Sequence, residues 1–217
     1  MKDYSQTLAE VRRRIEAAAL RARRDPESIR LVAVTKSLPR EEIAPLAALG
    51  ISDIGENRIL EGADRRRIVG SSFRWHMIGH VQTNKVKRLL EWVDVLHSLD
   101  RISLAEELEK HLAQTPRKLP SFVQVNVSGE ATKGGFAAGE TPEAVTLFRR
   151  DFPHLDIVGL MTMAPEGADA RPHFRRLSGL AEQCGLAQLS MGMSQDYEIA
   201  VEEGASVLRI GSALFSG

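Results

Sequence analysis

Residues 31 to 36 read Leu-Val-Ala-Val-Thr-Lys, a short run of strand-forming residues that ends on a lysine. Seven further apolar segments follow it along the chain, at residues 51–54, 73–78, 93–96, 122–127, 157–161, 187–191 and 207–210. Strands that are apolar on both faces are typical of parallel sheets, which are covered on both sides. Because helix-like segments separate these runs, the pattern predicts eight β/α units.

Eight β/α units in 217 residues fit a closed (β/α)8 barrel, the TIM-barrel architecture. An open, doubly wound sheet has the same local pattern and is the alternative, although the number of strands favours the barrel. The segment 5–23 carries an apolar stripe that predicts an extra amphipathic helix before the first strand, formed by Leu8, Val11, Ile15, Ala18 and Ala22. No linker-like segment divides the chain, so we expect residues 1–217 to form a single domain.

The composition bears on partners and location. With 29 basic and 29 acidic residues, the net charge does not predict binding to nucleic acid or to a membrane surface. The single cysteine, Cys184, excludes an internal disulfide and favours a reduced, cytoplasmic setting, and no cysteine cluster suggests a metal. No apolar run has the length of a membrane span or a signal core. These features predict a cytoplasmic protein, and the lack of a large apolar stripe favours a monomer.

In a barrel, functional residues gather at the carboxyl ends of the strands. Most residues at these ends are polar in this sequence, whereas the amino ends carry fewer groups capable of chemistry. The candidates, in chain order, are Lys36, Glu56, Asn57, His76, His80, His97, Asn126, Lys133, Met161, Thr162, Ser194, Arg209, Gly211 and Ser212. This asymmetry predicts a site at one mouth of the barrel.

Lys36 is the most distinctive of these candidates. Strand alternation places it on the same face as Val32 and Val34, so its amine would reach the barrel mouth. Removal from water in a crowded mouth favours the neutral amine, which is a nucleophile toward carbonyl groups. The alternative, and the commoner role for such a residue, is a lysine that starts the next loop and extends into water.

The last two predicted strands lead into the glycine- and serine-containing segments 190–196 and 207–212. Loops in this part of a barrel commonly bind phosphate through backbone N–H groups and hydroxyls. The alternatives are that Ser194 only caps the helix predicted at 195–203 and that Gly211 only forms a turn. Arg209 lies inside an apolar strand, where a buried guanidinium requires a partner, and taken alone it favours a structural salt bridge.

Other polar groups have simpler interpretations. His76 and His80 lack the spacing of a zinc-binding helix and are each interpreted as hydrogen-bonded histidines. The runs 12–14 and 65–67, which are all arginine, are interpreted as solvated helix faces.

Six motifs occur in an order that resembles the pyridoxal phosphate homeostasis protein family, whose members are similar to the barrel half of alanine racemases, a fold-type III barrel. They are LVAVTK, IGEN, WHMIGHVQTNK, GLMTMA, LSMGMSQDYEIAVEEG and VLRIGSALF, and they extend from the first strand to the end of the chain. The resemblance implies pyridoxal 5′-phosphate (PLP) as cofactor, with Lys36 forming its Schiff base, the internal aldimine. It also implies phosphate contacts from Ser194, Gly211 and Ser212, Arg209 at the pyridine nitrogen, and Asn57, Met161 and His76 near the ring. Lys133 is a candidate anion contact.

The resemblance also bears on catalysis. An arginine at the pyridine nitrogen disfavours its protonation and makes the ring a poorer electron sink. Alanine racemases of this fold add a second domain that supplies a tyrosine as acid/base, whereas this sequence ends at Gly217 and its two tyrosines, Tyr4 and Tyr197, lie in predicted helices. We therefore expect a carrier or buffer of PLP without substantial catalysis, whose partners would be apo forms of PLP-dependent enzymes. The alternatives are a PLP-dependent amino-acid racemase or related enzyme, and a barrel in which Lys36 acts on a phosphorylated sugar without a cofactor.

Overall fold

A closed ring of eight parallel strands forms the centre of the molecule, in a computed structural model that describes residues 3–130 and 133–215. The strands follow the order β4-β3-β2-β1-β9-β8-β7-β5, and a direct pairing of β4 with β5 closes the ring. This pairing confirms the predicted barrel over the open sheet. The strands of the ring are β1 (Arg30–Val34), β2 (Asp53–Glu56), β3 (Arg74–Met77), β4 (Val95–Leu99), β5 (Leu119–Asn126), β7 (Leu155–Met161), β8 (Gln188–Ser190) and β9 (Val207–Ile210).

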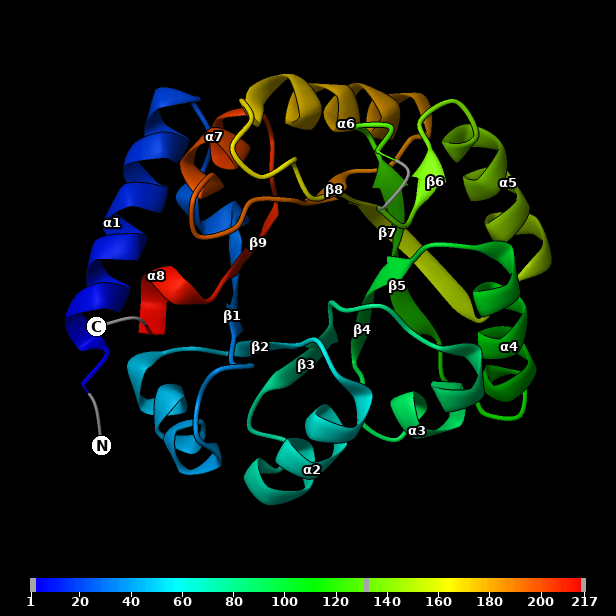
Figure 1. Cartoon of the computed structure of the whole chain (residues 1–217), viewed down its shortest axis with the longest axis horizontal. Coiled ribbons are helices and arrows are strands. Elements are labelled where there is room, and N and C mark those ends of the chain that lie inside the picture. The colour runs from blue at the N-terminus through cyan, green and yellow to red at the C-terminus, as the bar shows by residue number, and fades with distance from the viewer. Residues whose placement is uncertain (1–2, 131–132, 216–217) are drawn as a thin grey trace.

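The helices surround this ring, as Figure 1 shows in a view down the barrel. They are α1 (Ser5–Arg21), α2 (Ile59–Val69), α3 (Val86–Leu90), α4 (Ile102–Leu112), α5 (Thr141–Asp151), α6 (Arg171–Gln183), α7 (Tyr197–Glu202) and α8 (Ser212–Phe215). Short 3-10 helices η1 (Pro26–Ser28), η2 (Arg40–Glu42), η3 (Ala44–Leu49) and η4 (Thr83–Lys85) occupy connections, and a two-residue strand β6 (Phe136–Ala137) pairs with β5 outside the ring.

The predicted amphipathic opening helix is confirmed as α1. Its stripe of Leu8, Val11, Ile15 and Ala18 is buried, whereas Ala22 follows the last helical residue and is only half-buried. Arg14 on the outer face pairs with Glu198 at the start of α7, so the helix is fixed to the barrel by apolar packing and by surface ion pairs.

The structure differs from the prediction around Pro45. The helix-like segment between the first two apolar runs, which contains this proline, forms η2 and η3 instead, because proline has no N–H to donate and its ring clashes with the carbonyl of residue i−4. The following strand begins at Asp53 rather than Ile51, because the Ile51 N–H donates to the Leu46 carbonyl and closes the turn through Gly50, whose φ is +73°. The sheet can therefore begin only after this turn.

The barrel has two apolar layers. The outer layer lies between strands and helices and contains most of the buried side chains, including Trp75, Phe148 and Phe174. A small inner cluster fills the ring with Val32, Val95, Phe122, Met161 and Val207. Polar groups share this interior, so the barrel is a packed core that also carries hydrogen-bonded side chains.

Within residues 3–130 and 133–215, no helix is long and apolar enough to cross a membrane. The same part of the chain contains no group of three or more histidine, cysteine, aspartate or glutamate side chains that could hold a metal ion.

Candidate functional site

Three strands bring the predicted site residues to one mouth of the barrel. Ala33 of β1 pairs with Ile210 of β9, and Val34 pairs with Gly55 of β2. Because paired parallel strands end at the same edge, the residues after them emerge side by side. Lys36, Asn57 and Gly211 follow β1, β2 and β9, respectively, and so share the carboxyl-end mouth.

Lys36 stands in a turn directly after β1 and is exposed. The prediction that its amine is held in a crowded, desolvated interior is wrong for the protein by itself, because the strand ends at Val34 and the Lys36 side chain is exposed to solvent. The position is nevertheless a defined one, since the Thr35 N–H donates to the Gly55 carbonyl immediately before it.

A buried arginine holds the Lys36 turn from behind. One nitrogen of Arg65 donates to the Thr35 carbonyl at 2.7 Å, and another donates to the Leu38 carbonyl at 3.0 Å, so both flanks of Lys36 are fixed. Arg65 is only 7% exposed, which corrects its interpretation as part of a solvated face. Arg12, Arg13 and Arg14 are exposed as predicted.

Glu56 completes this support. Its carboxylate accepts from Arg65 at 2.6 Å and from the Thr35 hydroxyl, and the side chain is fully buried. Burial raises the pKa of Glu56, although the hydrogen bond from Thr35 and the charge of Arg65 oppose this shift. The Arg65–Glu56 pair therefore lies under the site as a desolvated ion pair, and its contacts point toward the backbone of the Lys36 turn.

Two backbone N–H groups converge at the end of β9. The N–H groups of Gly211 and Ala213 both point at the hydroxyl oxygen of Ser194, at 3.3 and 3.1 Å. Ser194 does not cap the next helix, because α7 begins at Tyr197 and Asp196 occupies the N-cap position. A Cβ atom on Gly211 would lie 3.2 Å from the Val34 carbonyl oxygen, which is closer than most Cβ contacts, so a glycine favours the close approach of the two strand ends. These groups form a place that suits an anion oxygen.

Arg209 lies in the barrel interior and is 4% exposed. It donates to the Ser190 hydroxyl at 2.5 Å and to the Thr162 carbonyl at 2.9 Å. Within residues 3–130 and 133–215, no carboxylate lies within ion-pair distance of its guanidinium, so the interpretation as a structural salt bridge is wrong. Burial lowers the pKa of Arg209 to about 10, against a smaller opposing effect of Asp196.

The histidines occupy different depths. His76 is fully buried in β3, in register with Gly55, and its ring nitrogens contact Asp53 and His97 at 2.8 Å each. It therefore lies below the mouth. His80 is exposed after β3 and lies 2.9 Å from Asp100. Both are hydrogen-bonded, as predicted.

The remaining candidates lie at other strand ends. Met161 ends β7 and is fully buried, Ser212 opens α8 and is exposed, and Asn57 is half-buried after β2. Lys133 lies 2.6 Å from Glu130 in the loop after β5, where Asn126 donates to the carbonyls of both residues.

Sequence reasoning missed Asp53 and Ser190, which are both buried and both bonded to groups of the barrel interior. The signal for Asp53 is a carboxylate inside the apolar segment 51–54, since a buried acid requires donors. Nothing local distinguishes Ser190 from a serine that merely ends a strand.

Comparison with known proteins gives consistent matches over nearly the whole length of the chain. The sequence model of the alanine racemase N-terminal domain matches residues 7–217. The pyridoxal phosphate homeostasis protein of Aquifex aeolicus is 38% identical over 218 residues, which cover 96% of this chain and 95% of the relative. The protein of the same name from Pseudomonas aeruginosa is 37% identical, with 99% and 96% covered.

Solved structures agree with this relationship. PipY of Synechococcus elongatus with PLP bound is 29% identical and superimposes with a TM-score of 0.78, covering 98% of this chain and 100% of that one. The same protein without PLP is 30% identical, with a TM-score of 0.84 and the same coverage. Alanine racemase from Corynebacterium glutamicum is 19% identical with a TM-score of 0.70, covering 97% of this chain and 60% of that one, and it supports the shared fold alone.

Proposed function

Because this chain belongs to the pyridoxal phosphate homeostasis protein family, which has the alanine racemase N-terminal fold, we propose that it binds pyridoxal 5′-phosphate at the carboxyl-end mouth of the barrel and serves in PLP homeostasis. The observation that carries the proposal is the combination of three groups at that mouth. They are the exposed amine of Lys36, the guanidinium of Arg209, which is buried below the mouth without a carboxylate partner in the described structure, and the two N–H groups that converge at Ser194.

These groups fit the chemistry of the cofactor. PLP, when bound, supplies an aldehyde that reacts reversibly with a primary amine. In our proposal Lys36 presents that amine, held in position by the contacts of Arg65 to Thr35 and Leu38. The hydroxyls of Ser194 and Ser212 would bind the phosphate. The N–H groups of Gly211 and Ala213, which donate to Ser194 in the protein by itself, would donate to a phosphate oxygen instead.

Arg209 would donate a hydrogen bond to the ring nitrogen. A guanidinium has five N–H donors, and the bonds to Ser190 and Thr162 leave others available. Since its pKa of about 10 is well above neutrality, Arg209 keeps its proton and does not transfer it to the ring. Asn57 and Met161 would line the pyridine ring of the cofactor, and His76 would lie in the layer of side chains below it.

We further propose a carrier or buffer rather than an amino-acid racemase. Racemisation needs a second acid/base group, and neither tyrosine is suited to that role. The Tyr4 hydroxyl donates to Glu42, which raises the pKa of Tyr4 to about 12. Burial raises the pKa of Tyr197, whose hydroxyl has no hydrogen-bond partner among the described residues.

We propose that residues 1–217 act as one barrel domain, that the protein is a cytoplasmic monomer, and that it passes PLP to apo forms of PLP-dependent enzymes. The single, buried Cys184 supports a reduced location. If an apo-enzyme regains activity no faster with the loaded protein than with PLP released into solution at the same rate, direct transfer is wrong.

The decisive experiment is an absorbance spectrum of the full-length protein with PLP added. We expect a visible band that borohydride bleaches, and its loss in Lys36→Ala, because the amine is the attachment point. Lys87→Ala, which removes an exposed lysine from α3, is the matched control and should keep the band.

Other outcomes would contradict the proposal. If the wild-type protein shows no band, PLP binding is wrong, and the alternative in which Lys36 acts on a phosphorylated sugar without a cofactor is favoured. A band that persists in Lys36→Ala would move the attachment to another residue. Rapid racemisation of amino acids by the loaded protein, at the roughly 1 to 1,000 per second typical of enzymes, would replace the carrier by a racemase.

A further inference from the structure

Five side chains form a continuous line of hydrogen bonds through the barrel interior. Asp53 contacts His76 at 2.8 Å, His76 contacts His97 at 2.8 Å, and His97 contacts the hydroxyl of Ser190 at 2.7 Å. Arg209 donates to the same hydroxyl at 2.5 Å. We call this set the interior chain. Its members come from β2, β3, β4, β8 and β9, and each is at most 5% exposed.

An ionised Asp53 and two neutral rings fix the direction of every bond. The Asp53 carboxylate can only accept, so His76 donates to it from Nε2, and Nδ1 of the neutral His76 ring accepts from Nε2 of His97. Nδ1 of the neutral His97 ring then accepts the single hydroxyl hydrogen of Ser190. The Ser190 oxygen in turn accepts from Arg209, which can only donate. All four bonds therefore run one way, and both histidines carry their hydrogen on Nε2.

The charges around the chain agree with two neutral rings. Burial lowers the pKa of His76, although the hydrogen bond and charge of Asp53 oppose this. Burial also lowers the pKa of His97 well below its usual range. The positive charges of Arg30 and Arg74 also disfavour protonation of both rings, and Arg209 adds to this effect at His97. A proton added to Nδ1 of either ring would point at the hydrogen that the neighbouring residue already donates to that nitrogen.

Asp53 is ionised at the other end. Burial favours its neutral form, but the hydrogen bonds from His76 and Ser52 and the charge of Arg30 outweigh this effect and lower its pKa. Ser52 donates to the carboxylate at 2.6 Å, and Arg30 lies 3.6 Å from it. The chain thus begins at a cation and ends at an anion.

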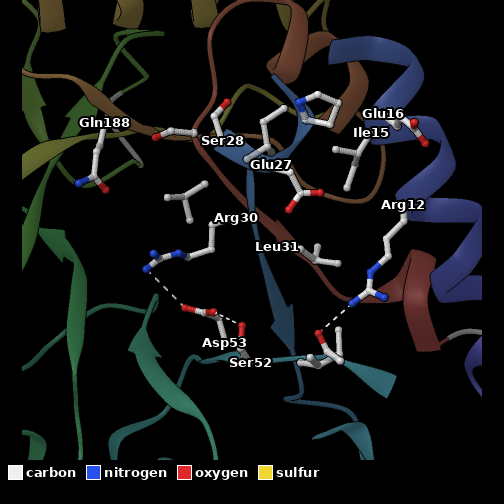
Figure 2. A pocket seen from close by; sticks show the side chains of 16 residues that line it. Arg12, Ile15, Glu16, Glu27, Ser28, Arg30, Leu31, Ser52, Asp53 and Gln188 are labelled. Atoms are coloured by element: carbon white, nitrogen blue, oxygen red, sulfur yellow. Dashed lines mark hydrogen bonds and ion pairs between the residues drawn. The ribbon is translucent and has the colours of Figure 1, made fainter. Parts of the chain in front are cut away.

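The acidic end faces a cavity of about 880 Å³ at the amino-end mouth of the barrel. Figure 2 shows Asp53 between Ser52 and Arg30 there, with Gln188 and Glu27 also lining the cavity. The interior chain therefore crosses the barrel from this cavity to Arg209, which the proposed function assigns to the cofactor.

We propose that Asp53, His76, His97 and Ser190 are positioning residues for Arg209. The one-way order of their hydrogen bonds keeps the Ser190 oxygen turned toward the guanidinium as an acceptor. With the Thr162 carbonyl, that acceptor fixes the plane in which Arg209 presents its remaining donors to the mouth. The role toward PLP rests on the proposed function, whereas the hydrogen-bond order does not.

Nitrogen NMR of the full-length protein without cofactor tests the order directly. Long-range ¹H–¹⁵N spectra should assign Nε2–H to both His76 and His97, and neither ring should titrate between pH 8 and pH 6. The terminal N–H signals of Arg209 should be resolved and slow to exchange. An Nδ1–H form of either ring at neutral pH, or a charged one, would overturn the order.

Ser190→Ala removes the central acceptor, and Ser121→Ala is its matched control. Ser121 is equally buried, but its hydroxyl donates only to the Leu119 carbonyl, outside the chain. We expect Ser190→Ala alone to collapse the Arg209 signals and to release His97 from its tautomer. Unchanged Arg209 signals in Ser190→Ala would overturn the positioning role.

The loaded protein gives a second reading. Loss of a hydrogen bond to a charged group should weaken PLP binding by roughly tenfold or more and shift the absorbance maximum in Ser190→Ala, but not in Ser121→Ala. Ser190→Thr, which keeps the hydroxyl, should restore the maximum. If wild type binds no PLP, the proposed function fails while the NMR result still decides the hydrogen-bond order. If wild type binds and both alanine variants bind equally, the positioning role toward PLP is wrong.

Discussion

The two mouths of the barrel differ in how far their charged groups are already paired. At the amino end, Arg30 lies beside Asp53, and Arg12 donates to the Gly50 carbonyl at 2.8 Å, so both arginines that line the large cavity there already have partners. At the carboxyl end, Lys36 is exposed, and Arg209 contacts only neutral oxygens among the described residues. The difference teaches that volume alone does not identify a binding site. Convergent donors without charged partners do, because an anionic ligand can complete them.

The largest expected effect is a difference in stability between a variant at the carboxyl-end mouth and one at the amino-end mouth. Arg65→Leu removes the partner of a fully buried Glu56 and should lower the free energy of unfolding by about 3 to 5 kcal/mol. Arg30→Leu breaks an ion pair whose arginine is 45% exposed, and should cost below about 1 kcal/mol. Urea unfolding of the two variants measures this difference.

A second variant separates lost charge pairing from lost packing. Replacing both Arg65 and Glu56 by leucine should recover most of the stability, because no uncompensated charge remains. Its Lys36 turn would still lack the contacts to Thr35 and Leu38, so PLP binding should stay weakened. Equal destabilisation by Arg65→Leu and Arg30→Leu would show that the buried ion pair near the carboxyl-end mouth matters no more for stability than the partly exposed pair at the amino end.

A smaller effect should appear at the anion position. Gly211→Val places side-chain atoms against the backbone and side chain of Val34 and should weaken PLP binding by roughly tenfold, at a stability cost of about 1 to 3 kcal/mol. Gly139→Ala is the control, since a Cβ there meets open space. Titration followed by absorbance gives both affinities, and wild-type affinity in Gly211→Val would argue against phosphate binding at this strand end.

The smallest effect concerns the interior between the mouths. Because the pKa of His97 is lowered on folding, the unfolded chain binds a proton more readily, and stability is present above about pH 6.5 and lost as the pH falls below it. One such histidine contributes a slope of up to about 1.4 kcal/mol per pH unit. His97→Gln should therefore flatten the fall of the unfolding free energy between pH 6.5 and 5.5. Parallel pH profiles for variant and wild type would show that His97 is not buried as a neutral ring.

Much of the architecture could be predicted from the chain. Each of the eight apolar runs overlaps a strand, because strands buried on both faces need little beyond a short apolar sequence between turn signals. The residues after those strands could also be predicted as neighbours, since parallel strands end at one edge. The exceptions follow local chemistry, as at Pro45, where a proline interrupts the expected helix.

The hydrogen-bond partners of buried polar groups could not be predicted from the sequence. Arg65 belongs to a run of three arginines that resembles a solvated face, yet it alone of the three turns inward to Glu56. The sequence around Arg209 favoured a salt bridge, but this residue donates to the Ser190 hydroxyl and the Thr162 carbonyl instead. Which residue satisfies a buried donor depends on positions far apart in the chain, and no local pattern specifies them.

The sequence by itself determined the barrel, the mouth and the candidate residues Lys36, Arg209 and Gly211, because strand periodicity and strand ends are local properties. Only the tertiary structure decided that residues 53, 76, 97, 190 and 209 form one line, since five strands must close into a ring, in a particular register, before these side chains can meet. The closed ring also excludes water, which leaves each of these polar groups dependent on the next for its hydrogen bond.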